Sequence, residues 1–299
     1  MKQKNIDVAV GLQTWNGKQY ISNALSSLLN QTYKNYKIFI HHNNSNIETL
    51  KIINKFKKKY PNKIVILEDK VHREIPEAIE FLCKKKLRFY KYMMMCGDDD
   101  IWHKDYISDN LKNLKENDLD LSYSLLKTTK PSKIYRNFPL YSSSKGLFRN
   151  LLFYLLYRNI VPLCFGIFKT KKFIKNLNYY MYFDESKTNY DNIFGLACIL
   201  NLKIGFTNKK LFTYRIKDRD KISKRKKNNL NFDSLIYQIL IFKFQFTFSV
   251  RALGLILKSS NMNIFMKLFF INYMILLYIQ KVSSFIIKRN IIRLKNLFR

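Results

Sequence analysis

Patterns typical of buried strands alternate with patterns typical of amphipathic helices over about the first 125 residues. Ile6–Leu12 is a continuous apolar run, and from Ile21 to Leu29 the apolar residues recur at the spacing of one helix face. The same alternation continues with strand patterns at 36–40, 64–67, 92–96 and 119–126, and helix patterns at 48–60, 77–87 and around 107–114. Repeated units of this kind predict an α/β fold, a Rossmann-like three-layer α/β/α sandwich around a parallel sheet.

In a sheet of this kind ligands bind beyond the carboxyl ends of the strands. The loops after Leu12, Ile40 and Cys96 are therefore where a functional site is expected. The chain beyond residue 126 is less regular, with strand patterns at 164–169, 203–206 and 211–216 and a helix pattern at 190–200. We predict one domain over residues 1–225, with halves of about 1–125 and 126–225, a boundary in the polar run Lys217–Asn229, and a helical region over 226–299.

The chain has 54 Lys and Arg against 21 Asp and Glu, a formal net charge of +33. Its 47% of hydrophobic residues excludes intrinsic disorder, and four dispersed cysteines without a CxxC pair argue against a disulfide framework or a zinc cluster. Coding bias in an AT-rich genome is one explanation of the Lys excess. An anionic membrane and nucleic acid are both attracted by such a charge. The first residues lack the apolar core of a secretory signal, so a cytoplasmic location is expected.

Two strongly apolar segments, Phe232–Leu257 and Met262–Ile287, are interrupted by single cations. Their longest charge-free stretch is the 13 residues Leu268–Gln280, whereas a spanning helix needs about 20. Lys267, Lys281, Lys288 and Lys295 share one heptad phase. These features predict amphipathic helices lying on an anionic membrane surface, the inner face of the cell membrane, as a peripheral association. The alternative is an ordinary helical subdomain whose cations are solvated.

Three consecutive carboxylates, Asp98, Asp99 and Asp100, directly follow the apolar strand pattern Tyr92–Cys96. Their mutual repulsion in a compact fold would be relieved by a divalent cation, and carboxylate oxygens suit Mg²⁺ or Mn²⁺ that also binds substrate phosphates. The alternative is a solvated acidic turn in which Asp100 caps the next helix.

Several of these segments resemble the motifs of one enzyme family. Val8–Asn16 resembles a first strand followed by a T-Y-N element, and Ala24–Tyr33 is very close to an S-(I/L)-L-x-Q-T-(Y/F) helix end. Ile38–Thr49 lies where that family has a strand and a D-D-x-S element, and Gly97–Trp102 resembles its D-x-D-D-x-W element. From residue 6 to about 223 the chain is similar to the inverting GT-A glycosyltransferases of family 2, of the bacterial cell-surface polysaccharide type.

The resemblance implies a nucleotide-binding first half and an acceptor-binding second half. It makes Asp99 the metal ligand, Asp98 a contact of the donor ribose or the metal, and Asp100 a supporting residue, with Thr14 and Asn16 lining the nucleotide pocket. Asn43 occupies the position of the family's uracil-contacting Asp and offers an NH₂ group where the Asp has only acceptors.

The resemblance also implies a general base, because an inverting transfer needs a carboxylate that accepts the proton of the attacking hydroxyl. Asp191, at the start of a helix pattern, matches that position, and Glu185 is the rival. The alternative for Asp191 is a first-turn acid stabilised by the helix dipole. Arg215, followed by Lys217 and Lys221, matches the family's terminal basic stretch and would approach the diphosphate, unless this stretch is a solvated linker.

We therefore expect a metal-dependent inverting glycosyltransferase of surface polysaccharide synthesis. Its expected partners are a nucleotide-sugar donor, UDP-linked in the manner of the family, a glycan or lipid-linked acceptor, and an anionic membrane surface, without nucleic acid. The alternatives are a membrane-associated, non-catalytic scaffold of the same fold and a basic nucleic-acid-binding protein.

Overall fold

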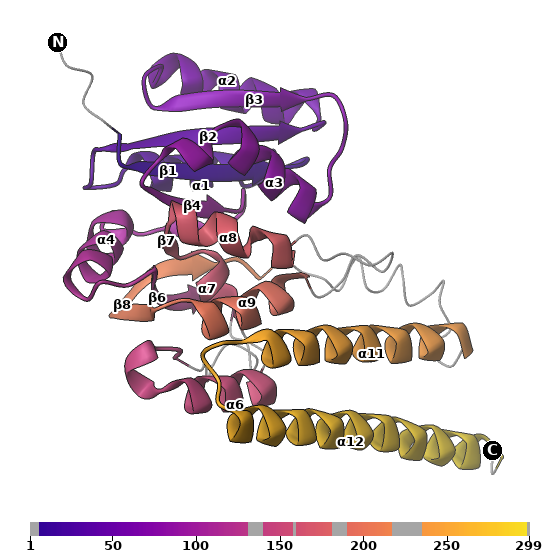
Figure 1. Cartoon of the computed structure of the whole chain (residues 1–299). Helices are drawn as coiled ribbons and strands as arrows, with labels where there is room; N and C mark the ends of the chain where they lie inside the picture. The colour runs from indigo at the N-terminus through magenta and orange to yellow at the C-terminus, as the bar shows by residue number, and fades with distance from the viewer. Residues whose placement is uncertain (1–5, 131–139, 158–159, 181–189, 217–234, 298–299) are drawn as a thin grey trace. The chain divides into compact units, whose positions relative to one another are not determined.

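The computed structural model describes residues 6–130, 140–157, 160–180, 190–216 and 235–297 (Figure 1). Contacts divide the chain into one unit of residues 1–183 and 190–216 and a second of residues 184–189 and 217–299. The composition predicts a boundary within residues 217–229, and the division by contacts falls after Ile216. Glu185, Lys217 and Lys221 lie outside the described residues.

An eight-stranded sheet runs through the first unit. Its strands are β1 (Val8–Thr14), β2 (Tyr36–Asn43), β3 (Ile64–Asp69), β4 (Tyr92–Cys96), β5 (Ile101–Trp102), β6 (Leu121–Thr128), β7 (Ile167–Lys169) and β8 (Ile204–Tyr214). Their order across the sheet is β3-β2-β1-β4-β7-β6-β8-β5.

The direction of the strands sets where the candidate site lies. Strands β3, β2, β1 and β4 are parallel neighbours, and β7 is antiparallel to both β4 and β6. Strand β8 is parallel to β6, and the short β5 is antiparallel to β8. Strands β6 and β8 consequently point the same way as β1, so their carboxyl ends share one edge with those of β1–β4. The predicted parallel sheet is right for β1–β4 and wrong for the whole sheet, because β7 and β5 reverse direction.

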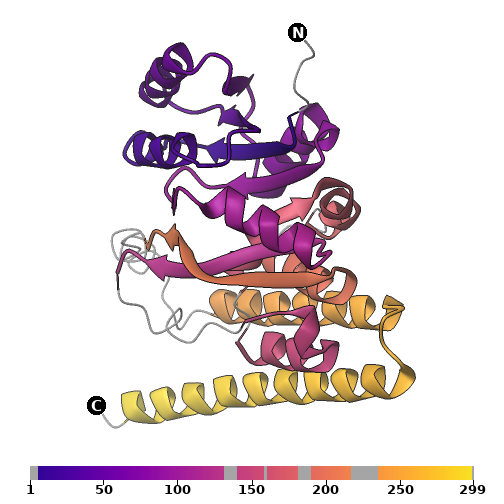
Figure 2. The same ribbon diagram turned by 90° about the vertical axis from the view of Figure 1, so that its left-hand side faces the viewer.

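Helices cover both faces of this sheet (Figures 1 and 2). Val8, Val10 and Leu12 of β1 pack in one core with the apolar face of α1, whereas Gly11 faces the other side, where a Cβ would lie 2.8 Å from Leu87. The period-two alternation of β1 thus divides its side chains between two layers of helices. The helices of this unit are α1 (Ile21–Leu29), α2 (Ile47–Lys59), α3 (Ile75–Lys85), α4 (Tyr106–Glu116), α6 (Leu147–Tyr157), α7 (Val161–Cys164), α8 (Thr170–Tyr180) and α9 (Tyr190–Asn201), with 3₁₀ turns at η1 (Leu87–Phe89) and η2 (Ser143–Lys145).

The second half of the unit departs most from the sequence prediction. Cys164, predicted to begin a strand, ends α7, because Pro162 favours a first helical turn and the Gly166 N–H then bonds back to the Leu163 carbonyl. The two short strands predicted at 203–206 and 211–216 are one strand, β8, whose register against β6 is irregular around Leu125. Helices α6 and α8 and strand β5 were not predicted.

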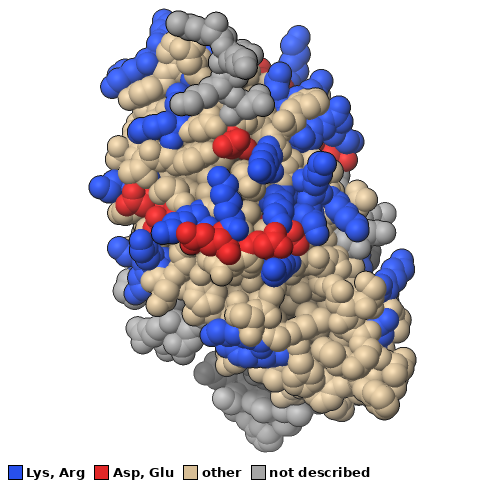
Figure 3. Space-filling model, turned by 60° about the vertical axis from the view of Figure 1, so that its left-hand side comes forward, with Lys and Arg blue, Asp and Glu red and all other residues tan. Residues whose placement is uncertain are grey.

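Charge is partly compensated on one face of the molecule. Figure 3 shows acidic side chains gathered in a band among Lys and Arg, and the described ion pairs include Lys209–Asp109 at 2.8 Å and Lys169–Asp118 at 2.9 Å. Exposed pairs of this kind are screened by solvent and contribute little to stability. From Ser234 to Arg299, by contrast, the sequence has ten Lys or Arg and no Asp or Glu.

The second unit contains two helices packed on each other, α11 (Leu235–Lys258) and α12 (Ile264–Leu297). The Asn263 side chain begins α12 by accepting a hydrogen bond from the Met266 N–H at 2.9 Å. Within the described residues, neither helix combines the length and the apolar character that a bilayer-crossing segment requires. Of the heptad cations, Lys267 is described, and the side chains of Lys281, Lys288 and Lys295 lie outside the described set.

Candidate functional site

The predicted site residues Thr14, Asn16, Asn43, Asp98 and Asp99 all lie at the carboxyl edge of the parallel strands. Thr14 and Asn43 are the last residues of β1 and β2, and the acidic run follows β4. This edge is where the topology of an α/β sheet predicts a ligand site.

The Thr14 hydroxyl donates a hydrogen bond to Asp98 Oδ2 at 2.6 Å. Thr14 is 2% exposed, so its position is fixed by the packing of β1. Gly17 makes this contact possible, because a Cβ at position 17 would lie 2.1 Å from Asp98 Oδ2 and 2.6 Å from Thr14 Oγ1. The loop after β1 therefore holds the first carboxylate of the acidic run in one orientation.

Arg215 joins the other two members of the acidic run. Its main-chain N–H donates to Asp100 Oδ1 at 2.8 Å, and its Nε donates to the Asp99 carbonyl oxygen at 2.7 Å. The guanidinium lies 4.5 Å from the ring centre of Tyr20, a cation–π contact. Asp100 is buried, and its carboxylate accepts a hydrogen bond from the main chain that follows β8. The alternative interpretation of Asp100 as the N-cap of the next helix is therefore wrong, because α4 begins after Asp105.

Antiparallel pairing of β5 with β8 brings Arg215 to this position. Ile101 is paired with Thr213 and Trp102 with Phe212, so the chain leaves β8 directly beside the acidic run. Because β8 and β4 point the same way, residues more than a hundred positions apart in sequence meet at one edge. The sequence alone contained no sign of β5, which is only two residues long.

Asn16 links the loops that follow β1 and β2. Its N–H donates to Ser45 Oγ at 2.6 Å, and its side-chain oxygen accepts from the Asn46 N–H at 3.0 Å. Asn16 has a φ of 53°, a left-handed conformation that Asn tolerates better than most residues. Asn46 in turn caps α2 by accepting from the Thr49 N–H. Asn16 thus ties the loop after β1 to the loop after β2 through Ser45 and Asn46.

The Asn43 amide forms a pair of hydrogen bonds with the main chain of Arg73. Asn43 Nδ2 donates to the Arg73 carbonyl and Asn43 Oδ1 accepts from the Arg73 N–H, both at 2.7 Å. The Arg73 side chain in turn bonds Asp69. Burial raises the pKa of Asp69, but the hydrogen bond from Arg73 opposes it, so the pKa lies below its ordinary value. Asn43 therefore anchors the loop after β3 at the carboxyl edge.

Asp191 lies in the first turn of α9, and none of its described hydrogen bonds joins it to the acidic run. Its Oδ1 accepts from the Asn192 N–H at 2.8 Å, and the Asn192 carbonyl accepts from the buried Tyr154 hydroxyl at 2.7 Å. Burial raises the pKa of the Asp191 carboxyl above its ordinary value, against the lowering effect of the Asn192 N–H. A carboxylate with a raised pKa at a helix start suits a proton acceptor.

Among the described residues, no three His, Cys, Asp or Glu side chains are arranged to hold a metal ion. Asp98 and Asp99 do supply hard oxygen donors, and Mg²⁺ is usually held by one or two carboxylates together with substrate phosphates. The two carboxylates therefore fit a divalent cation whose remaining ligands would come from a bound diphosphate and water.

Three features of this edge were not predicted from the sequence: the close approach at Gly17, the contact of Tyr20 with Arg215, and the aromatic pair of Trp15 with His72. Trp15 is 57% exposed, and its ring centre lies 4.8 Å from that of His72. Since loops after β1 and β3 carry these two rings, the sheet order rather than the sequence brings them together. An exposed Trp directly after a buried strand was the one available signal.

A family model described as glycosyl transferase family 2 matches residues 10–169 of this chain. The match spans β1 to β7, so it includes the acidic run but not Asp191 or Arg215. Comparison with curated proteins gave no match.

Solved structures resemble the fold of the chain at low sequence identity. S. aureus TarS 1-349 in complex with UDP is 17% identical with a TM-score of 0.62, covering 87% of this chain and 68% of that one. The complex of the same protein with UDP-GlcNAc is 18% identical with a TM-score of 0.62, covering 87% and 69%. The mannosyltransferase PcManGT from Pyrobaculum calidifontis, in complex with GDP-Man and Mn²⁺, is 12% identical with a TM-score of 0.53, covering 75% and 61%. At these identities the likeness shows a common GT-A fold.

The substitution Asn43→Asp, which introduces the family's residue, is expected to destabilise the protein. The carboxylate retains an acceptor for the Arg73 N–H but places an oxygen opposite the Arg73 carbonyl, where Asn43 donates. Loss of a buried donor of this kind costs about 1–3 kcal/mol. Thermal denaturation at pH 7 measures the change. Asn44→Asp, on an exposed neighbour, is the control and should leave the melting temperature unchanged; equal melting temperatures for Asn43→Asp and wild type would contradict the structural role of the amide.

Proposed function

Because the chain belongs to glycosyl transferase family 2 and is a glycosyltransferase, we propose that it transfers a sugar from a nucleotide-sugar donor to a hydroxyl of a glycan or lipid-linked acceptor. The transfer inverts the anomeric centre and serves the assembly of surface polysaccharide. The observation that carries the proposal is the clustering of Thr14, Asp98, Asp99, Asp100 and Arg215 at the carboxyl edge of the sheet.

The donor would lie across the loops after β1, β2 and β3. Trp15 and His72 offer an exposed aromatic surface on which a nucleobase can stack. Asn43, oriented by Arg73, contacts the base edge with the remaining capacity of its amide, and Thr14 and Asn16 line the pocket. UDP and UDP-GlcNAc in the TarS structures and GDP-Man in the PcManGT structure make nucleotide-sugars the donors to try first.

The diphosphate would lie against the acidic run. Asp99, with Asp98, would hold Mg²⁺ or Mn²⁺, and the bound cation would neutralise charge on the departing nucleotide. Asp98 is oriented for this role by Thr14, and Asp100 fixes the main chain of Arg215, whose guanidinium is held beside the run by Tyr20. Arg215 thereby places a second positive charge where the diphosphate lies.

The acceptor hydroxyl must lose a proton as it attacks the anomeric carbon. Asp191 is the proposed base, because burial raises the pKa of its carboxyl and so strengthens its hold on that proton. Glu185 remains the rival. Placing the donor and the hydroxyl within attack distance on one sheet edge replaces a bimolecular encounter by a pre-arranged one.

We also propose that the chain works at the inner face of the cell membrane, with α12 in contact with the lipid. Apolar side chains on one side of α12 are well exposed: Phe265 by 79%, Leu276 by 63% and Ile279 by 53%. Phe246 and Val250 form a similar exposed pair on α11. The positive charge of residues 234–299 complements anionic headgroups and opposes self-association of this surface.

Donor binding is tested with Gly17→Ala. The new Cβ must displace the Asp98 carboxylate, so binding of UDP-GlcNAc or GDP-mannose in MnCl₂ should weaken at least tenfold, equivalent to about 1.4 kcal/mol. Isothermal titration with MnCl₂ and with EDTA measures the affinity and its metal dependence. Gly254→Ala on α11, where a Cβ meets nothing within 4 Å, is the matched control. Binding of neither donor by the wild-type chain would refute the proposed donor class.

The base is tested with Asp191→Asn, which keeps an acceptor for the Asn192 N–H. Release of UDP from UDP-GlcNAc, with water as acceptor, should fall by about 10²–10⁴ while the donor affinity is unchanged. Because burial raises the pKa of Asp191, the wild-type rate should fall as the pH decreases through a value above the ordinary Asp range. Because the pKa of Asp191 is raised in the folded chain, its ionisation lowers the free energy of unfolding as the pH rises. The Asp191→Asn variant should therefore be no less stable than the wild type at pH 7. A full rate for Asp191→Asn with a reduced rate for Glu185→Gln would move the assignment to Glu185.

Membrane contact is tested by co-sedimentation with phosphatidylcholine vesicles with or without phosphatidylglycerol. The chain should bind the anionic vesicles more strongly, and the difference should shrink as salt screens the charges. Phe265→Ser should weaken binding, whereas Phe89→Ser, at a position 68% exposed in the first unit, should not. Equal weakening by both substitutions, or no preference for anionic vesicles, would contradict the assignment to α12.

A further inference from the structure

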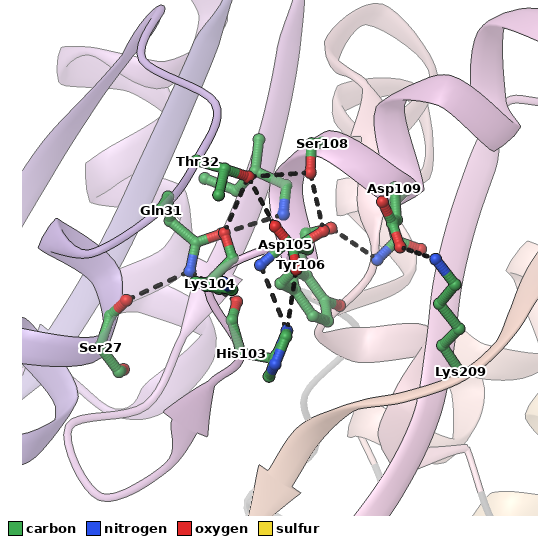
Figure 4. Close-up of polar contacts among 12 residues, drawn as sticks. Ser27, Gln31, Thr32, His103, Lys104, Asp105, Tyr106, Ser108, Asp109 and Lys209 are labelled. Atoms are coloured by element: carbon green, nitrogen blue, oxygen red, sulfur yellow. Dashed lines mark hydrogen bonds and ion pairs between the residues drawn. The ribbon is translucent and has the colours of Figure 1, made fainter.

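The end of α1 is bonded to the main chain that follows the acidic run (Figure 4). The Trp102 N–H donates to Ser27 Oγ at 3.2 Å, and Gln31 Nε2 donates to the His103 carbonyl at 2.8 Å. The next carbonyl, of Lys104, accepts from the Thr32 N–H at 2.8 Å. Three successive residues are thus held by three residues at the end of one helix.

Gln31 is the centre of this arrangement. It is fully buried, and its Nε2 also donates to the Ser27 carbonyl at 3.1 Å while its Oε1 accepts from the Ile107 N–H at 3.0 Å. The Ile107 N–H lies in the first turn of α4, where no intrahelical acceptor is available, and the Asp105 side chain makes no capping bond. Gln31 therefore supplies the cap of α4 from the segment that follows α1.

Thr32 secures the same segment from the surface. Its hydroxyl lies 2.9 Å from Asp105 Oδ1 and 3.2 Å from Ser108 Oγ, and it also reaches the Lys104 carbonyl at 3.2 Å. Unlike Gln31, Thr32 is exposed, so its hydroxyl can be removed without opening the core.

Strand β8 holds the segment 102–104 from the side opposite to α1. β5 is paired with Phe212 and Thr213, and the His103 N–H donates to the Leu211 carbonyl at 2.8 Å. The acidic run is the short connection between β4 and β5, so its geometry depends on where β5 lies. Arg215 depends on it too, because β5 is the partner of the end of β8.

We propose that Ser27, Gln31 and Thr32 are positioning residues of the donor site: they set the place of β5 and thereby of Asp99, Asp100 and Arg215. The proposal rests on the proposed function and gives the Gln31-Thr32 motif a role beyond helix packing. Of the hydrogen bonds described for these three residues, none goes to the side chains of Asp98, Asp99 or Asp100. A displacement of about 1 Å in a reacting geometry can cost about 10²-fold in rate, so small shifts of β5 are sufficient.

The main test uses Gln31→Glu, which preserves the shape and the acceptor for the Ile107 N–H but removes the donors to His103 and Ser27. The Mn²⁺ concentration that gives half the maximal rate of UDP release from UDP-GlcNAc should rise at least tenfold. The affinity for UDP, measured in EDTA, should stay unchanged. Lys209→Ala removes the exposed α4–β8 ion pair to Asp109 and is the control, with no change expected. A purely structural role would lower the melting temperature and leave the Mn²⁺ dependence at 25 °C unaltered, which would overturn the proposal.

Thr32→Val and Thr32→Ser form a second, milder pair. The valine removes the hydroxyl contacts and should raise the half-saturating Mn²⁺, whereas the serine keeps the hydroxyl and should restore the wild-type value. Both variants retain the main-chain bond to Lys104, so folding is expected in each case. Identical metal dependence for the two variants would contradict a positioning role for the Thr32 hydroxyl.

A fluorescence readout separates this proposal from the proposed function. The chain has two Trp residues, and in a Trp15→Phe background the emission comes from Trp102, which is 2% exposed and lies in β5. Gln31→Glu should increase acrylamide quenching of Trp102 at least twofold, and Lys209→Ala should not. Increased quenching, together with no binding of nucleotide-sugars by the chain that retains Trp15, would refute the function and retain the control of β5 by Gln31; unchanged quenching would refute that control.

Discussion

The three adjacent acidic residues that follow β4 are held by groups from the ends of two other strands. Thr14 orients Asp98, the main chain of Arg215 bonds Asp100, and the Arg215 side chain bonds the carbonyl of Asp99. These partners come from the ends of β1 and β8, so two of the three carboxylates and the main chain between them are bonded to groups distant in sequence.

Two strand reversals make the arrangement possible. Strand β7 runs antiparallel between β4 and β6, so β6 and β8 point the same way as β1. Strand β5 then turns back along β8 and places the acidic run next to the chain leaving that strand. A fully parallel sheet has no equivalent of this contact. The mixed sheet therefore places a positively charged residue from the second half of the domain beside the acidic run.

The sequence predicts the parts of this structure whose information is local. Strands β1, β2 and β4 are largely buried on both faces and appear as apolar runs, and the acidic run is visible as charge following one of them. The pairing of β5 with β8 joins segments more than a hundred residues apart, and so does the hydrogen bond from Arg215 Nε to the Asp99 carbonyl. No local sequence pattern encodes contacts of this range. Helix α8 was missed because its lysines and asparagines conceal its apolar face, whose Phe173 and Leu177 are buried.

Asn43 shows how a departure from a family motif can be absorbed. An Asp at this position has acceptors only, whereas the Asn amide both donates to and accepts from the main chain of Arg73. The substitution thus ties the loop after β3 more firmly to β2, and that loop carries His72 against Trp15. Recognition of the nucleobase would then depend less on a carboxylate at the base edge and more on stacking, which accepts any base.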